Sequence, residues 1–187
     1  MQYTPMHTLT TPRLTLRRLT MADTDAYFSR LGSSEAVTRY MLWQPHRSRA
    51  ESAASIQKAL TRYADGTGYR WAITLTGTDT LIGIIDLLRF CEETESCSFA
   101  YMLGEAFWNR GYGTEALKAV FSFAFEEMGV KTITADHFAE NAASGAVMRK
   151  AGMQYSRSIP EKYEKNGVRH TAVEYTITAG QRQQGNP

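Results

Sequence analysis

The chain has 187 residues and a formal net charge of +2, which is the length of one ordinary domain. Its proportions of hydrophobic and charged residues exclude an intrinsically disordered chain, and its scattered basic residues give no electrostatic footprint for nucleic acid. No segment approaches the roughly 20 apolar residues of a membrane span, and the N-terminus lacks a secretory signal pattern. We therefore expect a cytoplasmic protein that binds neither nucleic acid nor membrane.

The first half of the chain alternates between strand and helix signals. Residues 1–12 are polar and turn-like, and we expect a flexible lead there. Thr20 and Ser48 are each followed three residues later by an acid, a spacing that predicts helix starts. The predicted elements of this half are a strand over 13–19, a helix from 20 to about 31, a helical turn over 35–40, a helix from 48 to about 64, and strands over 69–75, 81–89 and 96–103.

The second half carries a longer helical pattern. Leu117, Val120 and Phe121 recur at helical spacing, and the Asn166-Gly167 pair predicts a hairpin between two strand-like runs. The predicted elements are helices over 113–127 and 142–150, strands over 132–137, 153–161 and 168–178, and a disordered tail over 179–187. This order, without repeat or linker, predicts one mixed α/β domain over 1–187 with its core at about 9–178.

Cys91 and Cys97 are the two cysteines of the chain. A domain of this size does not need a disulfide, so we expect free thiols in a reducing compartment. No histidine or cysteine has the spacing of a zinc site, and we expect no metal.

The stretch from Trp108 to Thr114 reads Trp-Asn-Arg-Gly-Tyr-Gly-Thr and lies between a predicted strand and the long helix. Its glycines permit a tight turn and the close approach of a ligand, and open amides at a helix start suit a phosphate or pyrophosphate. Arg110 adds positive charge. The Lys-Ser/Thr ending of a nucleoside-triphosphate loop is missing, as is the third glycine of a dinucleotide fingerprint. The glycines alone are also compatible with a tight turn that binds nothing.

A second informative stretch reads E-N-A-A-S-G-A-V-M-R-K-A-G-M over 140–153. Asn141 is placed to cap the helix, and Ser144 faces the ligand side if Val147 and Met148 face the core. Together with W-N-R-G-Y-G-T-E-A, this stretch resembles the GNAT superfamily of N-acetyltransferases, and within it the ribosomal-protein N-terminal (alanine or serine) acetyltransferases. The segments T-P-R-L-T-L-R-R-L, V-T-R-Y-M-L-W, L-I-G-I-I and Y-E-K-N-G extend the resemblance over about residues 9–178.

The resemblance implies a fold and a co-substrate. The fold is a mostly antiparallel, splayed sheet of about seven strands flanked by helices, and it opens where the strand 96–103 parts from 132–137. Acetyl-CoA would lie in that opening, with its pantetheine arm along the strand 96–103 and its pyrophosphate on the loop from Asn109 to Thr114. The residues that the resemblance assigns to acetyl-CoA are Tyr101, Met102, Leu103, Asn109, Arg110, Gly111, Tyr112, Gly113, Thr114, Asn141, Ser144 and Lys150.

The implied reaction is the attack of an amine on a thioester, which needs a proton acceptor for the amine and favours a proton donor near the sulfur. Ser144 matches a serine that this branch carries near the sulfur. Where the branch carries a glutamate before the final Asn-Gly turn, this chain has Tyr163 with Glu164 beside it, and a second glutamate position holds Ser98. The catalytic candidates are Ser144, Tyr163 and Glu164, and the alternative bases, acting through water, are Glu164, Asp86 and His137.

The acceptor is expected near the opening, among aromatic and acidic side chains: Tyr40, Trp43, Trp71 and Asp86. Three functions remain open. The protein acetylates the α-amino group of a protein, it acetylates a small amine such as a polyamine, amino acid or antibiotic, or it binds acyl-CoA without catalysis. An open, acid-lined cleft would favour a protein acceptor, and a closed cleft a small amine. We expect a monomer or a homodimer.

Overall fold

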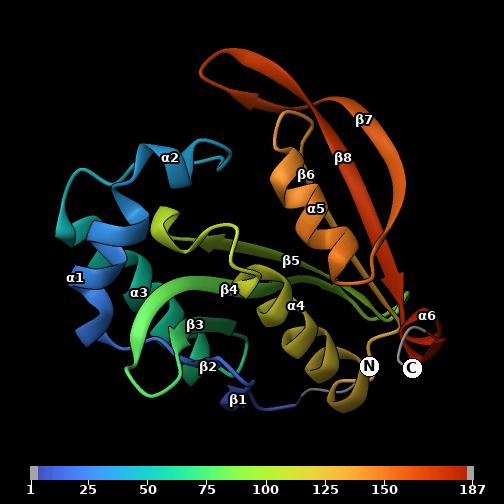
Figure 1. Cartoon of the computed structure of the whole chain (residues 1–187), viewed down its shortest axis with the longest axis horizontal. Coiled ribbons are helices and arrows are strands. Elements are labelled where there is room, and N and C mark those ends of the chain that lie inside the picture. The colour runs from blue at the N-terminus through green and yellow to red at the C-terminus, as the bar shows by residue number, and fades with distance from the viewer. Residues whose placement is uncertain (1–3, 185–187) are drawn as a thin grey trace.

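Eight strands form one sheet in the order β1-β2-β3-β4-β5-β6-β8-β7 in the computed structural model, which describes residues 4–184 (Figure 1). All neighbouring strands are antiparallel except β5 and β6, which are parallel. The strands are β1 (Leu9–Thr10), β2 (Leu14–Arg18), β3 (Tyr69–Leu75), β4 (Thr80–Cys91), β5 (Ser96–Leu103), β6 (Thr132–Phe138), β7 (Gln154–Lys165) and β8 (Val168–Thr178). The mixed α/β fold with a mostly antiparallel sheet is confirmed, with β1 as an additional strand.

Helices cover both faces of the sheet. The helices are α1 (Thr24–Tyr27), α2 (Glu35–Thr38), α3 (Arg49–Ala64), α4 (Tyr112–Ser122), α5 (Ala142–Lys150) and α6 (Ala179–Gln184). On one face, Tyr27 and Ile56 of α1 and α3 pack with Ala72 of β3. On the other, Leu117 of α4 packs with Trp71, the neighbour of Ala72. Successive strand side chains point to opposite faces, so two hydrophobic clusters form on one sheet.

The sheet opens between its two parallel strands. β5 pairs with β6 only over Ser96–Ser98 and Thr132–Thr134, and the two strands then diverge (Figure 1). We call the space between residues 99–103 of β5 and 135–138 of β6 the wedge. The predicted parting of these two strands is confirmed, and it leaves backbone groups of β5 available to a ligand along the wedge.

The expected flexible lead is wrong for the described part of residues 1–12. Met6 is buried, and Leu9 pairs with Leu16 in β1 and β2. The indole Nε1 of Trp71 donates to the carbonyl oxygen of His7 at 2.9 Å. These long-range contacts order a segment whose own composition is turn-like, because they satisfy backbone groups and bury the side chain of Met6.

The expected disordered tail is also partly wrong, since Ala179–Gln184 forms α6. Residues 1–3 and 185–187 lie outside the described part of the chain. Cys91 and Cys97 are both free thiols, and burial raises the pKa of Cys97 to about 12. None of the helices within residues 4–184 combines the length and apolar character needed to cross a membrane.

Candidate active site

The loop before α4 borders the wedge. Asn109 and Gly111 have left-handed backbone conformations, with φ of 58° and 81°, and α4 begins at Tyr112 directly afterwards. No side chain of the described residues caps this helix, so the amides of its first turn are open to an anion. The Trp108 indole Nε1 donates to the Leu103 carbonyl oxygen at 2.7 Å, which ties the loop to the end of β5.

A second set of contacts holds the loop from the side of β2. Arg13 donates from Nη1 to the Arg110 carbonyl oxygen at 3.0 Å and pairs with the carboxylate of Glu115 in α4. Thr11 donates its hydroxyl to the same carboxylate at 2.6 Å. Burial acts to raise the pKa of Glu115, but the hydrogen bonds from Thr11 and Arg13 outweigh it and hold the pKa below the usual 4.5. The Arg110 side chain stays exposed.

Gly113 is the point at which three elements meet beside the wedge. A Cβ built on it would lie 3.4 Å from side-chain atoms of Leu103 and Tyr101 in β5 and of Val147 in α5. The lack of a side chain lets the start of α4 approach both elements closely. The start of α4, the end of β5 and α5 therefore pack against one another beside the wedge.

Asn141 caps α5 as the sequence predicts, because its side chain accepts the Ser144 N–H at 3.3 Å. The hydroxyl of Ser144 also interacts with the phenol of Tyr101. Burial raises the pKa of Tyr101, and the hydrogen bond from Ser144 opposes this shift. The hydroxyl groups of Tyr101 in β5 and Ser144 in α5 therefore lie near each other beside the wedge. Lys150 is exposed at the last residue of α5.

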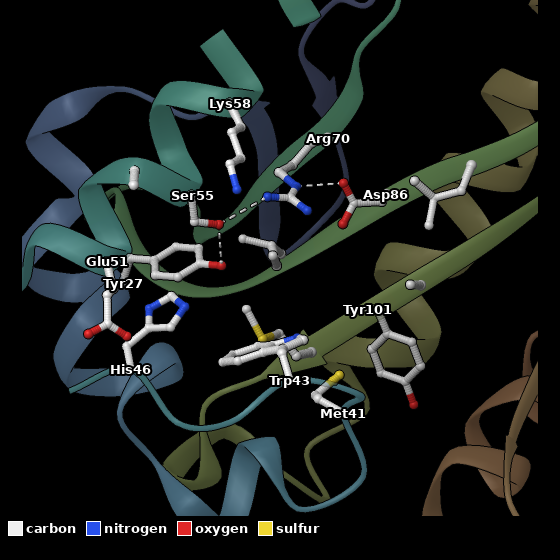
Figure 2. Close-up of a pocket in the computed structure, with 15 residues that line it drawn as sticks. Tyr27, Met41, Trp43, His46, Glu51, Ser55, Lys58, Arg70, Asp86 and Tyr101 are labelled. Atoms are coloured by element: carbon white, nitrogen blue, oxygen red, sulfur yellow. Dashed lines mark hydrogen bonds and ion pairs between the residues drawn. The ribbon is translucent and has the colours of Figure 1, made fainter. Parts of the chain in front are cut away.

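A cavity of about 500 Å³ adjoins Tyr101. It lies between α3, the strands β3, β4 and β5, and the segment 41–46 that follows α2 (Figure 2). Its lining residues are Tyr27, Met41, Trp43, His46, Glu51, Ala54, Ser55, Lys58, Arg70, Ile84, Asp86, Leu88, Ala100, Tyr101 and Met102. We call this space the acceptor cavity.

Arg70 and Asp86 form an ion pair in the wall of the acceptor cavity. They face each other directly from β3 and β4, and Arg70 Nε donates to Asp86 Oδ1 at 2.6 Å. Arg70 Nη1 also lies 3.5 Å from the Ser55 hydroxyl. Asp86 is only 6% exposed, and burial raises its pKa while Arg70 opposes the shift. The second carboxylate oxygen and the third guanidinium nitrogen point into the cavity (Figure 2).

The opposite wall is aromatic. The rings of Trp43 and Tyr27 lie 5.0 and 6.0 Å from the ring of His46. His46 Nδ1 is 2.8 Å from the Ser52 hydroxyl. Burial lowers the pKa of His46, opposed by Glu51, so the imidazole is neutral near physiological pH and Glu51 is the charged group of this wall.

Of the predicted acceptor residues, Trp43 and Asp86 line the cavity. The placement of Trp71 was wrong. Its side chain is fully buried and packs on the α4 side of β3, while its neighbour Arg70 faces the cavity. Tyr40 lies outside the cavity lining and connects the segment after α2 to the turn before α5, since its hydroxyl donates to the Glu140 carbonyl oxygen at 3.4 Å.

The predicted catalytic positions near the hairpin lie away from the acceptor cavity. Tyr163 stacks on Phe138 with ring centres 4.7 Å apart, and Glu164 is exposed. Their neighbour Lys165 donates to the carbonyl oxygens of Thr38 and Met41 at 2.8 and 2.6 Å. The tip of the β7–β8 hairpin is therefore fastened to the segment that also lines the acceptor cavity.

The other two positions considered for a base are inside the fold. His137 Nδ1 lies 2.7 Å from the Phe138 carbonyl oxygen. Its Nε2 is buried without a partner among the described residues, 2.7 Å from where a Cβ on Gly145 would fall. Ser98 is buried and donates to the Leu88 carbonyl oxygen at 3.3 Å.

Sequence reasoning missed Arg70, Ser55 and Lys58. Arg70 did carry a signal, because it is a charged residue inside the apolar run Tyr69–Leu75, and such a residue needs a partner. Ser55 and Lys58 gave none, since α3 carries another serine and other basic residues with no feature that sets these two apart. Within residues 4–184, no group of three or more His, Cys, Asp or Glu side chains is arranged to hold a metal ion.

The split sheet, the open amides before α4 and the adjoining cavity leave room for an extended, phosphorylated ligand between the parallel strands and for a second ligand beside it. Residues 13–154 match the family model described as an acetyltransferase (GNAT) domain. The chain therefore belongs to the GNAT acetyltransferase family and is an N-acetyltransferase.

Individual proteins agree with this assignment. The chain is 29% identical over 169 residues to the uncharacterized N-acetyltransferase YoaA of Bacillus subtilis, covering 90% of this chain and 95% of that protein. It shares its fold with a Vibrio cholerae protein provisionally assigned as a ribosomal-protein-serine acetyltransferase, with a TM-score of 0.82 and 23% identity. That alignment covers 94% of this chain and 99% of the Vibrio cholerae protein. The microcin C7 self immunity acetyltransferase MccE, solved with acetyl-CoA and AMP, gives a TM-score of 0.79 at 16% identity, covering 90% of this chain and 93% of MccE.

Proposed function

We propose that the protein transfers an acetyl group from acetyl-CoA to a primary amine of a small molecule that binds in the acceptor cavity. The observation that carries the proposal is the position of Tyr101, which lines the cavity and interacts with Ser144 across the wedge. An amine in the cavity and an acetyl group in the wedge would meet at this residue. A cavity of about 500 Å³ also falls within the ordinary size range of small-molecule sites.

The residues around the wedge fit acetyl-CoA, which supplies an activated acetyl thioester. The open amides over 109–114, with Arg110 beside them, suit its pyrophosphate. The backbone of residues 101–103 has no strand partner on the wedge side and suits the amides of the pantetheine arm. Asn141 and Lys150, at the two ends of α5, would complete the site.

Asp86 takes up the proton that the amine must lose. The attacking amine is neutral, so a base within reach of the cavity is needed. Burial raises the pKa of Asp86, which makes its carboxylate a stronger proton acceptor than an exposed one. This role replaces the one considered for Tyr163 and Glu164, which do not line the cavity.

Tyr101 and Ser144 supply a proton to the departing sulfur. Their hydroxyl groups lie near each other, so either one can donate to the sulfur. In the overall transfer a C–N bond forms, the C–S bond breaks, the amine proton passes through Asp86 to solvent, and the thiol is released with a proton from this pair, which takes one back from solvent.

The second candidate acceptor is the α-amino group of a protein. The provisional description of the Vibrio cholerae protein favours it, although that likeness concerns the fold. The size of the cavity, about 500 Å³, favours the small amine, because it lies in the range of small-molecule sites.

The test follows thiol release from acetyl-CoA with a panel of small amines and of peptides with free N-termini. We expect turnover with small amines, and a roughly 10- to 100-fold lower kcat in Ser144→Ala with unchanged CoA affinity by calorimetry. Ser29→Ala, which removes an exposed hydroxyl bonded to the Asp25 carbonyl oxygen, is the matched control. Turnover of peptides alone would establish the second candidate, and CoA binding without transfer to any amine would refute both.

A further inference from the structure

The Arg70–Asp86 pair leaves two groups open to the acceptor cavity. Among residues 4–184, Asp86 Oδ2 and Arg70 Nη2 have no hydrogen-bond partner, since the pair is joined through Oδ1 and Nε. Neither atom is sealed inside the protein, because the one fully buried and unpartnered side-chain nitrogen or oxygen among these residues is His137 Nε2. Both open atoms point into the cavity (Figure 2). The pair therefore offers an anionic acceptor and a cationic donor to the same ligand.

The Arg70 end of the cavity carries further positive charge. Lys58 of α3 lines the cavity, extends toward Arg70 (Figure 2), and forms no ion pair with any residue between 4 and 184. Glu51, the second acid of the lining, already accepts the Arg47 backbone N–H at 3.2 Å at the start of α3. Lys58 thus has no counter-charge at this end, which suits an anionic group.

The positive and negative side chains of the acceptor cavity lie at different distances from the wedge, because they belong to different elements. Lys58 belongs to α3 and Arg70 to β3, while Asp86 belongs to β4. Asp86 stands opposite Ala100 in β5, one residue before Tyr101. The open carboxylate oxygen is therefore one strand nearer to the wedge than the open guanidinium nitrogen. A ligand with both charges would place its cationic group toward the wedge and its anionic group away from it.

We propose that the acceptor is an α-amino acid, or a close analogue with a carboxylate next to its primary amine. The carboxylate binds Arg70 Nη2 and Lys58, and the amino group lies at Asp86 Oδ2 beside Tyr101. This inference rests on the proposed function. Guanidinium N–H groups match carboxylates in geometry and charge. A polyamine would bring positive charge against Arg70 and Lys58, and the first residue of a protein has no free α-carboxylate, because that group is in the peptide bond.

The experiment compares free amino acids with their carboxamides and with the corresponding decarboxylated amines, using acetyl-CoA and the full-length protein. We expect kcat/KM to be at least about tenfold higher for the free acid than for its carboxamide. Lys58→Gln should raise KM for the acid about three- to tenfold and leave KM for the carboxamide unchanged. Lys118→Gln, at an exposed lysine of α4, is the matched control and should change neither value.

Arg70→Gln should abolish the preference for the free acid, and Lys58→Gln keeps the test valid if that variant does not fold. Carboxamides, peptides or polyamines that react as fast as the free acid would overturn the inference and leave the N-acetyltransferase in place. The same holds if Lys58→Gln alters the acid and the carboxamide equally. Failure of every amine to react, with CoA still bound, would instead overturn the proposed function and this inference with it.

Discussion

Replacement of Asp86 by asparagine tests the ion pair in the cavity wall. The change keeps the size of the side chain and an oxygen that can accept from Arg70 Nε, now 2.6 Å away, but it removes the negative charge. Asp86 is 6% exposed, while the Arg70 side chain is 24% exposed. Removing one partner of a buried pair costs about 3–5 kcal/mol. Water and the Ser55 hydroxyl still reach Arg70, so we expect a loss of about 2–3 kcal/mol of unfolding free energy.

Urea denaturation followed by tryptophan fluorescence measures the loss in stability, and thiol release measures kcat. We expect kcat to fall roughly 10²- to 10⁴-fold, the usual contribution of a proton acceptor, with unchanged CoA affinity. In combination with Arg70→Gln, the two stability losses should fall short of additivity by about 1–3 kcal/mol. Asp25→Asn, which breaks the exposed pair with Arg49, should change little. Wild-type stability and kcat in Asp86→Asn would refute both roles of this residue.

The other predictions concern the loop before α4 and the hairpin. Gly111→Ala strains a backbone with φ of 81° and should cost about 1–2 kcal/mol of unfolding free energy and weaken CoA binding in calorimetry. Gly77→Ala, with φ of 83° and nothing within 4 Å, should cost the same and leave CoA affinity intact; equal CoA affinity in both variants would exclude a role of Gly111 in binding. Since the pKa of Glu115 lies below 4.5, its carboxylate stabilises the fold above that pH. The stability difference between wild type and Glu115→Gln should therefore be full at neutral pH and shrink as the pH falls through the folded-state pKa, and a constant difference would contradict this account. Lys165→Met removes two hydrogen bonds to backbone carbonyls and should speed amide hydrogen exchange over residues 38–44, whereas unchanged exchange would show that the hairpin does not order this segment.

The sequence by itself determined the elements that depend on neighbouring residues. The bounds of α5 followed from the cap at Asn141, and the start of β8 from the turn at Asn166-Gly167. The glycine loop before α4 was likewise readable, because a left-handed backbone at Gly111 and open amides at a helix start need only a few consecutive residues. Such short-range chemistry acts in the same way whatever surrounds it.

Only the tertiary structure decided which side chains meet. Alternation along β3 separates Arg70 from Trp71, but the positions of α3 and α4 decide which of them faces the cavity and which enters the core. The partnership of Arg70 with Asp86 depends on the register of two strands, and the order of residues 4–10 depends on contacts with β2 and β3. These choices are made by burial and pairing between segments distant in sequence, which a local pattern does not contain.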